Sequence, residues 1–322
     1  MESGLIHAYL LDGSGKGRRL SWAEVKDWQP SQGRLWLHFD YTAPEARAWI
    51  TGPAKLDPLV SDALLTEETR PRTTSIGDGL LIALRGVNLN PESQPEDMVS
   101  IRVWAEADRV ISTRKRQLLS ITDLCHQLDS GRGPRNCADL VVELADLLVW
   151  RMSDTVESFE ETIDELEDRV VAGASGALRL DLALLRKQTI TLRRYLSPQR
   201  EALARLMAEK MDWVSEGNRL QLREVSDRLL RHIEDIDAVR ERAAVTQEEL
   251  MSRISEQLNS RMYVLSIIAA IFLPLGFLTG LLGVNVGGIP GSENPRAFLI
   301  FSVLLTVTVA IQLVVFRWKK WL

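Results

Sequence analysis

The stretch LLGVNVGGIPG (Leu281–Gly291) closes an apolar run that begins at Met262, and then turns back through glycines and a proline. No charged side chain occurs in residues 262–292 or in residues 297–316, where Gln312 is the most polar residue. A helix of about 20 residues rises about 30 Å, which matches the hydrocarbon core of a bilayer. Because buried helices of soluble proteins rarely run this long without a charge, both segments are predicted to be transmembrane helices.

The flanks of these segments predict an orientation. We expect spans at 262–282 and 297–316, joined by an external loop at 283–296 whose one basic residue is Arg296. The basic residues on the other side of the spans are Arg253, Arg261 and, in a basic tail at 317–322, Arg317, Lys319 and Lys320. Because cytoplasmic flanks carry an excess of lysine and arginine, both termini are expected in the cytoplasm.

Composition limits the possible functions. The 322 residues carry a net charge of −5, which argues against nucleic acid as a partner. The two cysteines, Cys125 and Cys137, fit no zinc-finger spacing and read as small apolar residues. The soluble part shows no nucleophile–base pair and no metal cluster, so we do not expect an enzyme.

Residues 1–115 are predicted to form a cytoplasmic α/β domain with one small sheet. Five segments have the β-branched and aromatic composition of strands: Leu5–Leu11, Arg34–Asp40, Gly79–Val87, Met98–Glu106 and Arg109–Arg114. Two segments between them, Pro44–Ile50 and Asp57–Leu65, have helical patterns. The fold class is therefore α+β, followed by a helical region.

Residues 116–218 are predicted to be helical, with acidic helices. We expect one helix over Ala138–Ala172 and a second over Ala177–Leu196, with a shorter segment from Pro198 that ends at Glu216–Asn218. A stalk helix should then cover 219–261. No proline or glycine follows Asn218 until Pro274, so the stalk is expected to continue into the first span. Its narrow apolar stripe needs neighbours, which predicts packing against copies of itself.

One pair of spans cannot enclose a conduit, so a pore requires several chains. The first span continues the stalk and is the better candidate for the lining. Residues at steps of three and four predict one face of that helix: Asn259, Met262, Ser266, Ala269, Leu273, Gly276 and Gly280. Small residues leave room near an axis, although Gly276 and Gly280 would equally allow close helix packing. Pro274 leaves the carbonyl of Ala270 without its helical donor.

The same stretch lacks metal ligands. Residues 262–292 contain no His, Cys, Asp or Glu, so zinc would find no nitrogen or sulfur and magnesium no carboxylate. A passing divalent ion should therefore keep most of its water. A ring of Asn285 carboxamides could bind such an ion through its waters. With no titratable group along the span, any proton coupling must use water, Glu293 or cytoplasmic groups.

The Gly283–Val284–Asn285 tripeptide, at the end of a first span and before a second span with a basic tail, resembles the CorA metal-ion transporter family. Within that family the Gly-Val-Asn form is similar to the zinc transporters of the ZntB type. Two soluble stretches carry the same resemblance: LLTEETRPR (Leu64–Arg72) and LRGVNLNPESQPEDMVSIRVW (Leu84–Trp104). The resemblance implies a homopentamer with a funnel-shaped cytoplasmic domain and first spans that line the pore.

The resemblance also implies roles for single residues. Gly283, Val284 and Asn285 take the place of the selectivity loop, and Asn259 that of the polar ring at the inner mouth. Constrictions are implied at Met262, Leu265 and Leu273. Gly276 stands where magnesium members often have a hydroxyl residue. This departure puts a polar ring in the middle of the pore in doubt, although Thr279 lies one helical step away.

Two acidic features each allow two interpretations, a functional role and a side chain that is simply exposed to water. Glu293 would place a ring of negative charge at the outer mouth and concentrate cations there, or it is a plain solvated loop residue. Glu157, Glu161 and Glu165 lie on one face of a helix at i, i+4 spacing, where like charges repel. A regulatory cation between subunits would relieve this repulsion. The alternative is a charged face turned to water.

The leading hypothesis is a zinc transporter of the bacterial inner membrane that passes hydrated ions, with or without proton coupling. Zinc would be its transported ion, and no permanently bound cofactor is expected. Its partners would be the lipid bilayer, divalent cations and other copies of itself. The first alternative is a magnesium or cobalt channel of the same fold. An alternative of another class is a membrane-anchored coiled-coil scaffold or sensor.

Overall fold

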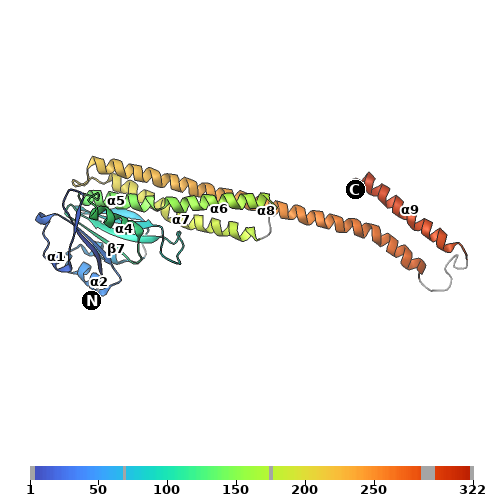
Figure 1. Ribbon diagram of the computed structural model, residues 1–322, viewed down its shortest axis with the longest axis horizontal. Coiled ribbons are helices and arrows are strands. Elements are labelled where there is room, and N and C mark those ends of the chain that lie inside the picture. The colour runs from blue at the N-terminus through green and yellow to red at the C-terminus, as the bar shows by residue number, and fades with distance from the viewer. Residues whose placement is uncertain (1–3, 68–69, 174–176, 284–293, 320–322) are drawn as a thin grey trace. The chain divides into compact units, whose positions relative to one another are not determined.

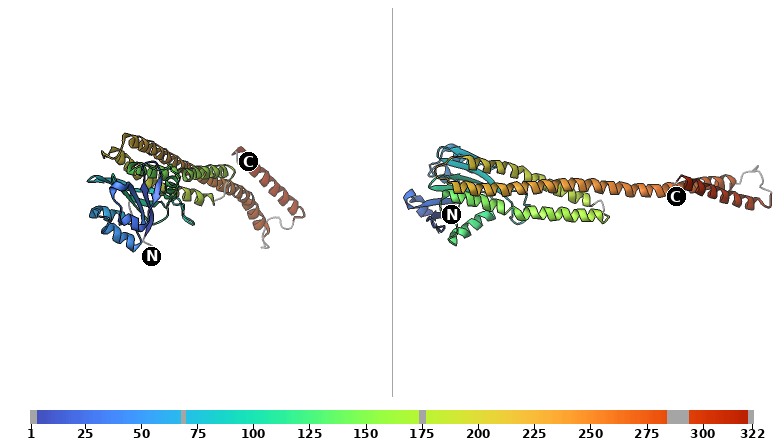
Figure 2. Two further views of the ribbon diagram at one scale, coloured as in Figure 1. Left: turned by 60° about the vertical axis from the view of Figure 1, so that its left-hand side comes forward. Right: turned by 90° about the horizontal axis from the view of Figure 1, so that it is seen from above.

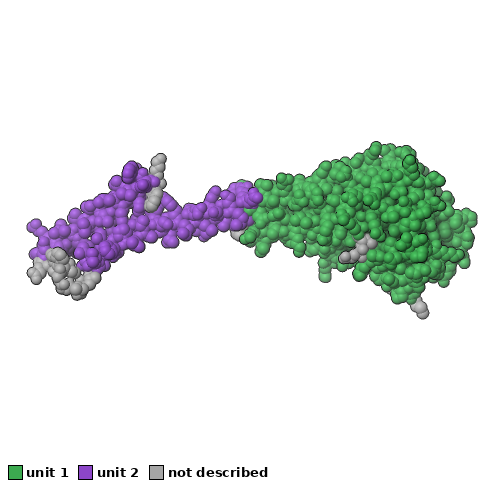
Figure 3. Space-filling model, turned by 180° about the vertical axis from the view of Figure 1, so that it is seen from behind, with its two compact units in different colours: residues 1–247 green, residues 248–322 purple. Residues whose placement is uncertain are grey.

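The computed structural model describes residues 4–67, 70–173, 177–283 and 294–319. It contains two compact units, residues 1–247 and residues 248–322 (Figure 3). The first unit holds a sheet and most of the helices, and the second holds the end of one long helix together with the last helix (Figures 1 and 2).

Seven strands form one sheet in the order β2-β1-β3-β7-β6-β5-β4. They are β1 (Leu5–Leu11), β2 (Gly17–Arg19), β3 (Arg34–Asp40), β4 (Arg72–Ile76), β5 (Gly79–Gly86), β6 (Val99–Ala105) and β7 (Arg109–Arg114). Strands β3 and β7 pair in parallel, with Trp36 opposite Val110, and the other neighbouring pairs are antiparallel. The five predicted strands are confirmed. The two strands that were not predicted, β2 and β4, are the edges, and β4 buries Thr73 alone.

Alternation along β3 assigns the two faces of the sheet. Leu35, Leu37 and Phe39 pack in a core with residues of three short helices, α1 (Trp22–Lys26), α2 (Pro44–Thr51) and α3 (Pro58–Leu65). The helices predicted over Pro44–Ile50 and Asp57–Leu65 are confirmed. On the other face, α5 (Cys137–Trp150) packs against β3, β5 and β6. Gly86 permits this approach, because a Cβ there would lie 2.7 Å from a methyl group of Leu148.

A polar cluster around the buried side chain of His38 lies between β3 and β7. The Nε of Arg114 donates to Nε2 of His38 at 3.0 Å, so the imidazole proton lies on Nδ1. That Nδ1 lies 2.8 Å from the Ser112 hydroxyl oxygen, which also accepts from the Trp36 indole at 3.0 Å. Complete burial, helped by the charge of Arg114 and by His7, holds the pKa of His38 well below its ordinary value.

The single helix predicted over Ala138–Ala172 is wrong, because the chain breaks at Arg151 and Met152 into α5 and α6 (Ser153–Val171). Arg151 donates to both carboxylate oxygens of Asp123, on α4 (Leu119–Asp129), at 2.8 and 2.7 Å. Met152 is fully buried. The side chains at the break are thus anchored by tertiary contacts that a helical propensity pattern does not contain.

The helix end predicted at Leu196 is also wrong, because α7 (Leu178–Ala208) continues through Pro198. An internal proline costs a helix about 3 kcal/mol. Contacts with the sheet offset that cost. The Gln199 side chain accepts from the backbone N–H of Arg85 at 2.7 Å, and the Thr73 hydroxyl donates to the carbonyl of Ala202 at 2.8 Å.

The long helix α8 runs from Glu216 to Gly283, 68 residues. Glu216–Asn218 therefore forms its first turn and does not end the preceding segment. Ser215 explains the start, since its hydroxyl accepts from the Asn218 N–H at 3.2 Å while the Asn218 side chain accepts from the Ser215 N–H at 3.1 Å.

The apolar stripe of α8 finds its neighbours within the same chain. Its residues up to Ala243 are buried in the first unit: Val225, Leu229, Ile233, Ile236, Val239 and Ala243. Helices α6 and α7 run alongside α8 there, as both figures show (Figures 1 and 2). The inference that this stripe requires other copies is thus wrong for this part of the helix. Farther along, Leu258 is exposed in the single chain.

Candidate ion pathway

In the part of the chain that the structure describes, two helices are long and apolar enough to cross a membrane, the end of α8 and α9 (Ala297–Trp318). The described part of α8 after Arg261 contains no charged residue. Its predicted pore face is uncovered in the single chain: Asn259, Met262, Leu265, Ser266, Ala269, Leu273, Gly276 and Gly280 are all exposed. These residues share an arc of the helix because they recur at steps of three and four.

The glycines of this face do not serve packing within one chain. A Cβ added at Gly276, Gly280 or Gly283 would have no described heavy atom within 4 Å. The alternative of close helix packing would therefore have to involve another chain. Open space beside the backbone is also what a lining helix provides, because small residues expose carbonyl oxygens to water near an axis.

In both spans there are hydroxyl groups that bond to carbonyl oxygens of their own helix. Thr279 lies 2.9 Å from the carbonyl oxygen of Leu275 and 3.1 Å from that of Gly276, and its one proton serves these two acceptors. In α9, Ser302, Thr306 and Thr308 each donate to the carbonyl four residues earlier, at 2.9, 2.9 and 2.8 Å. The oxygen lone pairs of Thr279 remain available to accept hydrogen bonds from water, so this residue can make the middle of the span weakly polar.

The polar side chain that joins the two spans is Gln312. Pro274 has no N–H, so the Ala270 carbonyl lacks its helical donor. The Gln312 Nε2 donates to this carbonyl oxygen at 3.3 Å. The oxygen that the sequence predicts to be freed by Pro274 is therefore bound by α9, an arrangement that the sequence alone did not predict.

The described part of the predicted selectivity loop is Gly283, which ends α8. Val284, Asn285 and Glu293 lie outside the described residues. The roles assigned to these three residues, as a hydrated-ion site and a cation-attracting ring, therefore stay predictions.

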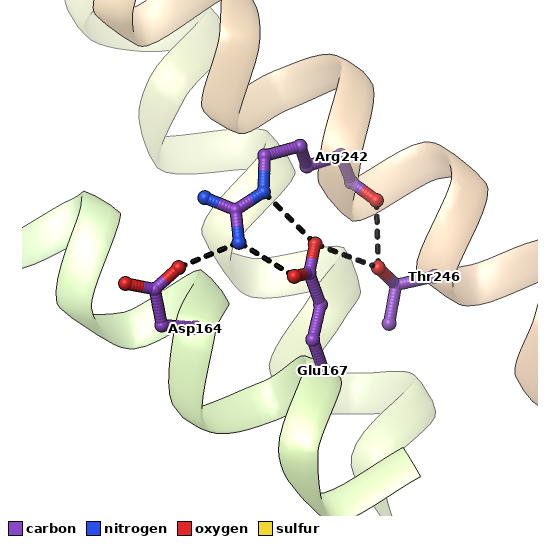
Figure 4. Close-up of polar contacts among 4 residues, drawn as sticks. All are labelled: Asp164, Glu167, Arg242 and Thr246. Atoms are coloured by element: carbon purple, nitrogen blue, oxygen red, sulfur yellow. Dashed lines mark hydrogen bonds and ion pairs between the residues drawn. The ribbon is translucent and has the colours of Figure 1, made fainter. Parts of the chain in front are cut away.

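The acidic helix α6 is partly neutralised by Arg242 of α8 (Figure 4). Arg242 donates through Nε to Glu167 at 2.9 Å and through Nη2 to Glu167 and Asp164, each at 2.5 Å. Thr246 donates to the Arg242 carbonyl at 2.8 Å. These bonds raise the pKa of Arg242, which stays charged. This network was not predicted from the sequence, although the arginines of the long helix were the available signal.

Glu157, Glu161 and Glu165 are exposed on the same helix. Burial and the carboxylates of Asp235, Asp164 and Glu157 raise the pKa of the neighbouring Glu160. In the described part of the chain, no group of three His, Cys, Asp or Glu side chains is placed to hold a metal ion. The regulatory cation site stays a prediction.

Comparisons with known proteins agree with these features. The sequence matches the family of CorA-like Mg2+ transporter proteins over residues 31–319. It is 42% identical to the divalent cation transporter CmaX of Pseudomonas aeruginosa, over 100% of this chain and 98% of the relative. It is 39% identical to the zinc transport protein ZntB of Yersinia enterocolitica, over 99% of this chain and 97% of the relative.

The fold agrees as well. The structure of full-length CmaX matches with a TM-score of 0.88 at 41% sequence identity, over 100% of this chain and 99% of that one. The α+β domain, the long helix and the final apolar helix thus recur together in a solved relative. The chain belongs to the CorA-like Mg2+ transporter family, a family of divalent cation transporters.

Proposed function

We propose that this protein transports zinc across the bacterial inner membrane as a homopentamer whose first spans surround a water-containing pore. The observation that carries the proposal is the composition of the first span: from Met262 to Gly283, α8 has no charged side chain and no His or Cys. Stripping water from a divalent ion requires such ligands. The ion therefore passes with its hydration shell. In this proposal both termini lie in the cytoplasm, as the basic flanks of the spans favour.

The pore wall acts through dipoles. Exposed backbone beside Gly276 and Gly280, and the amide of Asn259, offer oxygen atoms that accept hydrogen bonds from the ion's water. In this proposal Asn285 forms the selective ring, and Glu293 raises the local cation concentration at the outer mouth. Protons, where they are coupled, travel through water, Glu293 or cytoplasmic groups, because the described part of the span holds no titratable relay.

Zinc is proposed over magnesium because the Gly-Val-Asn form and the ZntB relative point to zinc. A magnesium or cobalt channel is the second candidate. It is supported by the family description and by CmaX, whose name specifies divalent cations without choosing one.

The test is uptake of zinc and of magnesium into liposomes that hold the purified protein, with and without a pH gradient. We expect zinc uptake, and a loss of at least about tenfold in Asn285→Ala, because a loss of roughly 1.4 kcal/mol summed over the whole ring already corresponds to a factor of ten. Asn294→Ala is the matched control in the same loop; Asn294 accepts from the Arg296 N–H at 2.9 Å and should matter little for flux.

Two outcomes would overturn the proposal. Liposomes that carry magnesium but not zinc would reverse the order of the two ions. No flux of either ion, with Asn285→Ala indistinguishable from the unmodified protein, would favour the scaffold or sensor.

A further inference from the structure

Two features of the spans meet at one atom, the carbonyl oxygen of Ala270. Pro274 removes the N–H that would bind this oxygen within α8. The side chain of Gln312 on α9 supplies a replacement donor, with its Nε2 at 3.3 Å. Its Oε1 is buried and has no hydrogen-bond partner among the described residues. The Gln312 amide thus bonds to the first span through its NH2 group alone.

The orientation of this amide follows from chemistry. A carbonyl oxygen only accepts, so the group that faces it must be the donating NH2 and not the amide oxygen. An unpartnered carbonyl is costly in a bilayer, where no lipid atom donates a hydrogen bond. A proline in a spanning helix is tolerated when a neighbouring helix satisfies the freed group.

We propose that Gln312 is a positioning residue of the ion pathway. By binding the carbonyl that Pro274 frees, it holds the first span in one bent geometry and so sets where Leu273 and the glycines beyond it lie. This inference rests on the proposed lining role of the first span. Gln312 makes a side-chain hydrogen bond from α9 to the first span, whereas Ser302, Thr306 and Thr308 bond within α9.

Proline and glutamine should therefore depend on each other. In Pro274→Ala the backbone regains an N–H at position 274, which can bind the Ala270 carbonyl within the helix. The donor of Gln312 is then redundant. A residue that merely fills space between the helices would show no such dependence, because its packing does not require a missing N–H.

The experiment is a double-mutant cycle on the assembled, full-length protein in liposomes. Gln312→Met keeps the length of the side chain and removes the donor. We expect zinc uptake to fall about three- to tenfold, the range of one interhelical hydrogen bond in a membrane protein. In a Pro274→Ala background the same substitution should change uptake by less than about twofold, because the coupled bond is absent there. Thr308→Val removes a hydroxyl one turn before Gln312 and should match the unmodified protein, since Thr308 bonds its own helix.

A second readout does not depend on transport. Spin labels at Val264 and Leu281, on chains diluted with unlabelled ones, report the bend of the first span. Gln312→Met should broaden their distance distribution, and adding Pro274→Ala should narrow it again. If Gln312→Met instead lowers the yield of assembled protein, Pro274→Ala should restore that yield.

Equal loss in both backgrounds, or no effect of Gln312→Met on uptake and bend, would overturn the inference. If the unmodified protein moves no cation, the proposed function fails, and the label distances still decide the role of Gln312.

Discussion

One polar bridge between helices in the first unit can be compared with one in the second unit. In the first unit, the guanidinium of Arg242 on α8 binds the carboxylates of Asp164 and Glu167 on α6 (Figure 4). In the second unit, the neutral amide of Gln312 binds the carbonyl of Ala270. Both bridges join two helices through side-chain donors, but only the first uses charge.

The difference follows from the available solvent. The carboxylates of Asp164 and Glu167 are 64% and 35% exposed, so water solvates the charges and the ion pairs cost little. A charge in a bilayer costs several kcal/mol, so the described spans use an amide, hydroxyls and backbone carbonyls instead. An uncharged wall cannot strip a divalent ion of water, and it need not do so if the ion stays hydrated.

The largest expected effect on zinc uptake comes from placing a charge in the first span, the helix whose Ala270 carbonyl binds Gln312. Leu273→Lys adds a cation to the proposed pore face, at an insertion cost of about 2.5–3.5 kcal/mol per chain. That cost, together with repulsion of cations, should lower zinc uptake on the order of 100-fold. Gln257→Lys adds the same charge before the span, on the opposite face, and should retain most uptake. Full uptake by Leu273→Lys would break the comparison.

Burial outside the membrane also favours the neutral form of a side chain, as His38 shows. Its folded pKa lies below the ordinary value, so the folded state resists protonation. The stability contributed by neutral His38 is present above pH 6.5 and is lost as pH falls from there, by at most about 1.4 kcal/mol per pH unit. In His38→Gln, thermal unfolding between pH 7.5 and 5 should depend less on pH. The exposed residue His126 gives the control, and equal slopes for His38→Gln and His126→Gln would contradict the expectation.

Breaking the bridge between Arg242 and its two carboxylates should have a smaller effect on stability, because water solvates these charges. Arg242→Gln leaves Asp164 and Glu167 without their partner and should lower the free energy of unfolding by about 1 kcal/mol. Arg240→Gln removes a pair with Asp237 on the same helix, at 3.4 Å, and should cost only a few tenths of that. Thermal unfolding of the full-length protein measures both. Equal losses would show that the bridge between helices has no special role.

The smallest effect is expected on the acidic face of α6. If divalent cations relieve repulsion there, zinc or magnesium should raise the unfolding temperature less in Glu161→Gln than in the unmodified protein. Repulsion at i, i+4 spacing amounts to about 0.2–0.5 kcal/mol per pair, so the difference should be small. Glu224→Gln removes an exposed acid elsewhere, as the control. An identical cation response in both variants would favour the solvated-face interpretation.

The parts of the fold that sequence predicted are those with strong local patterns. Buried strands such as β5 have continuous apolar residues, and after Gly217 the long α8 has no glycine or proline before Pro274. The failures involve long-range contacts. The edge strand β4 is polar and exists through pairing with β5, and α7 passes Pro198 because the sheet holds Gln199.

The candidate site divides in the same way. The uncharged face of the first span follows from residue spacing alone, and the structure leaves it exposed. Only one partner of the hydrogen bond at Ala270 could be predicted. The sequence shows that Pro274 frees this carbonyl, but it does not show that Gln312, 42 residues along the chain, binds it. Arg242 and its carboxylates were missed for the same reason.

The central claim is that one face of the first span lines a water-containing path. Leu273→Cys and Leu275→Cys place a thiol on that face and on the opposite one, while the native Cys125 and Cys137 are buried. Zinc uptake into liposomes is measured before and after a water-soluble, charged thiol reagent. We expect the reagent to block Leu273→Cys and to spare Leu275→Cys. Block of Leu275→Cys alone, or of neither variant, would contradict the claim.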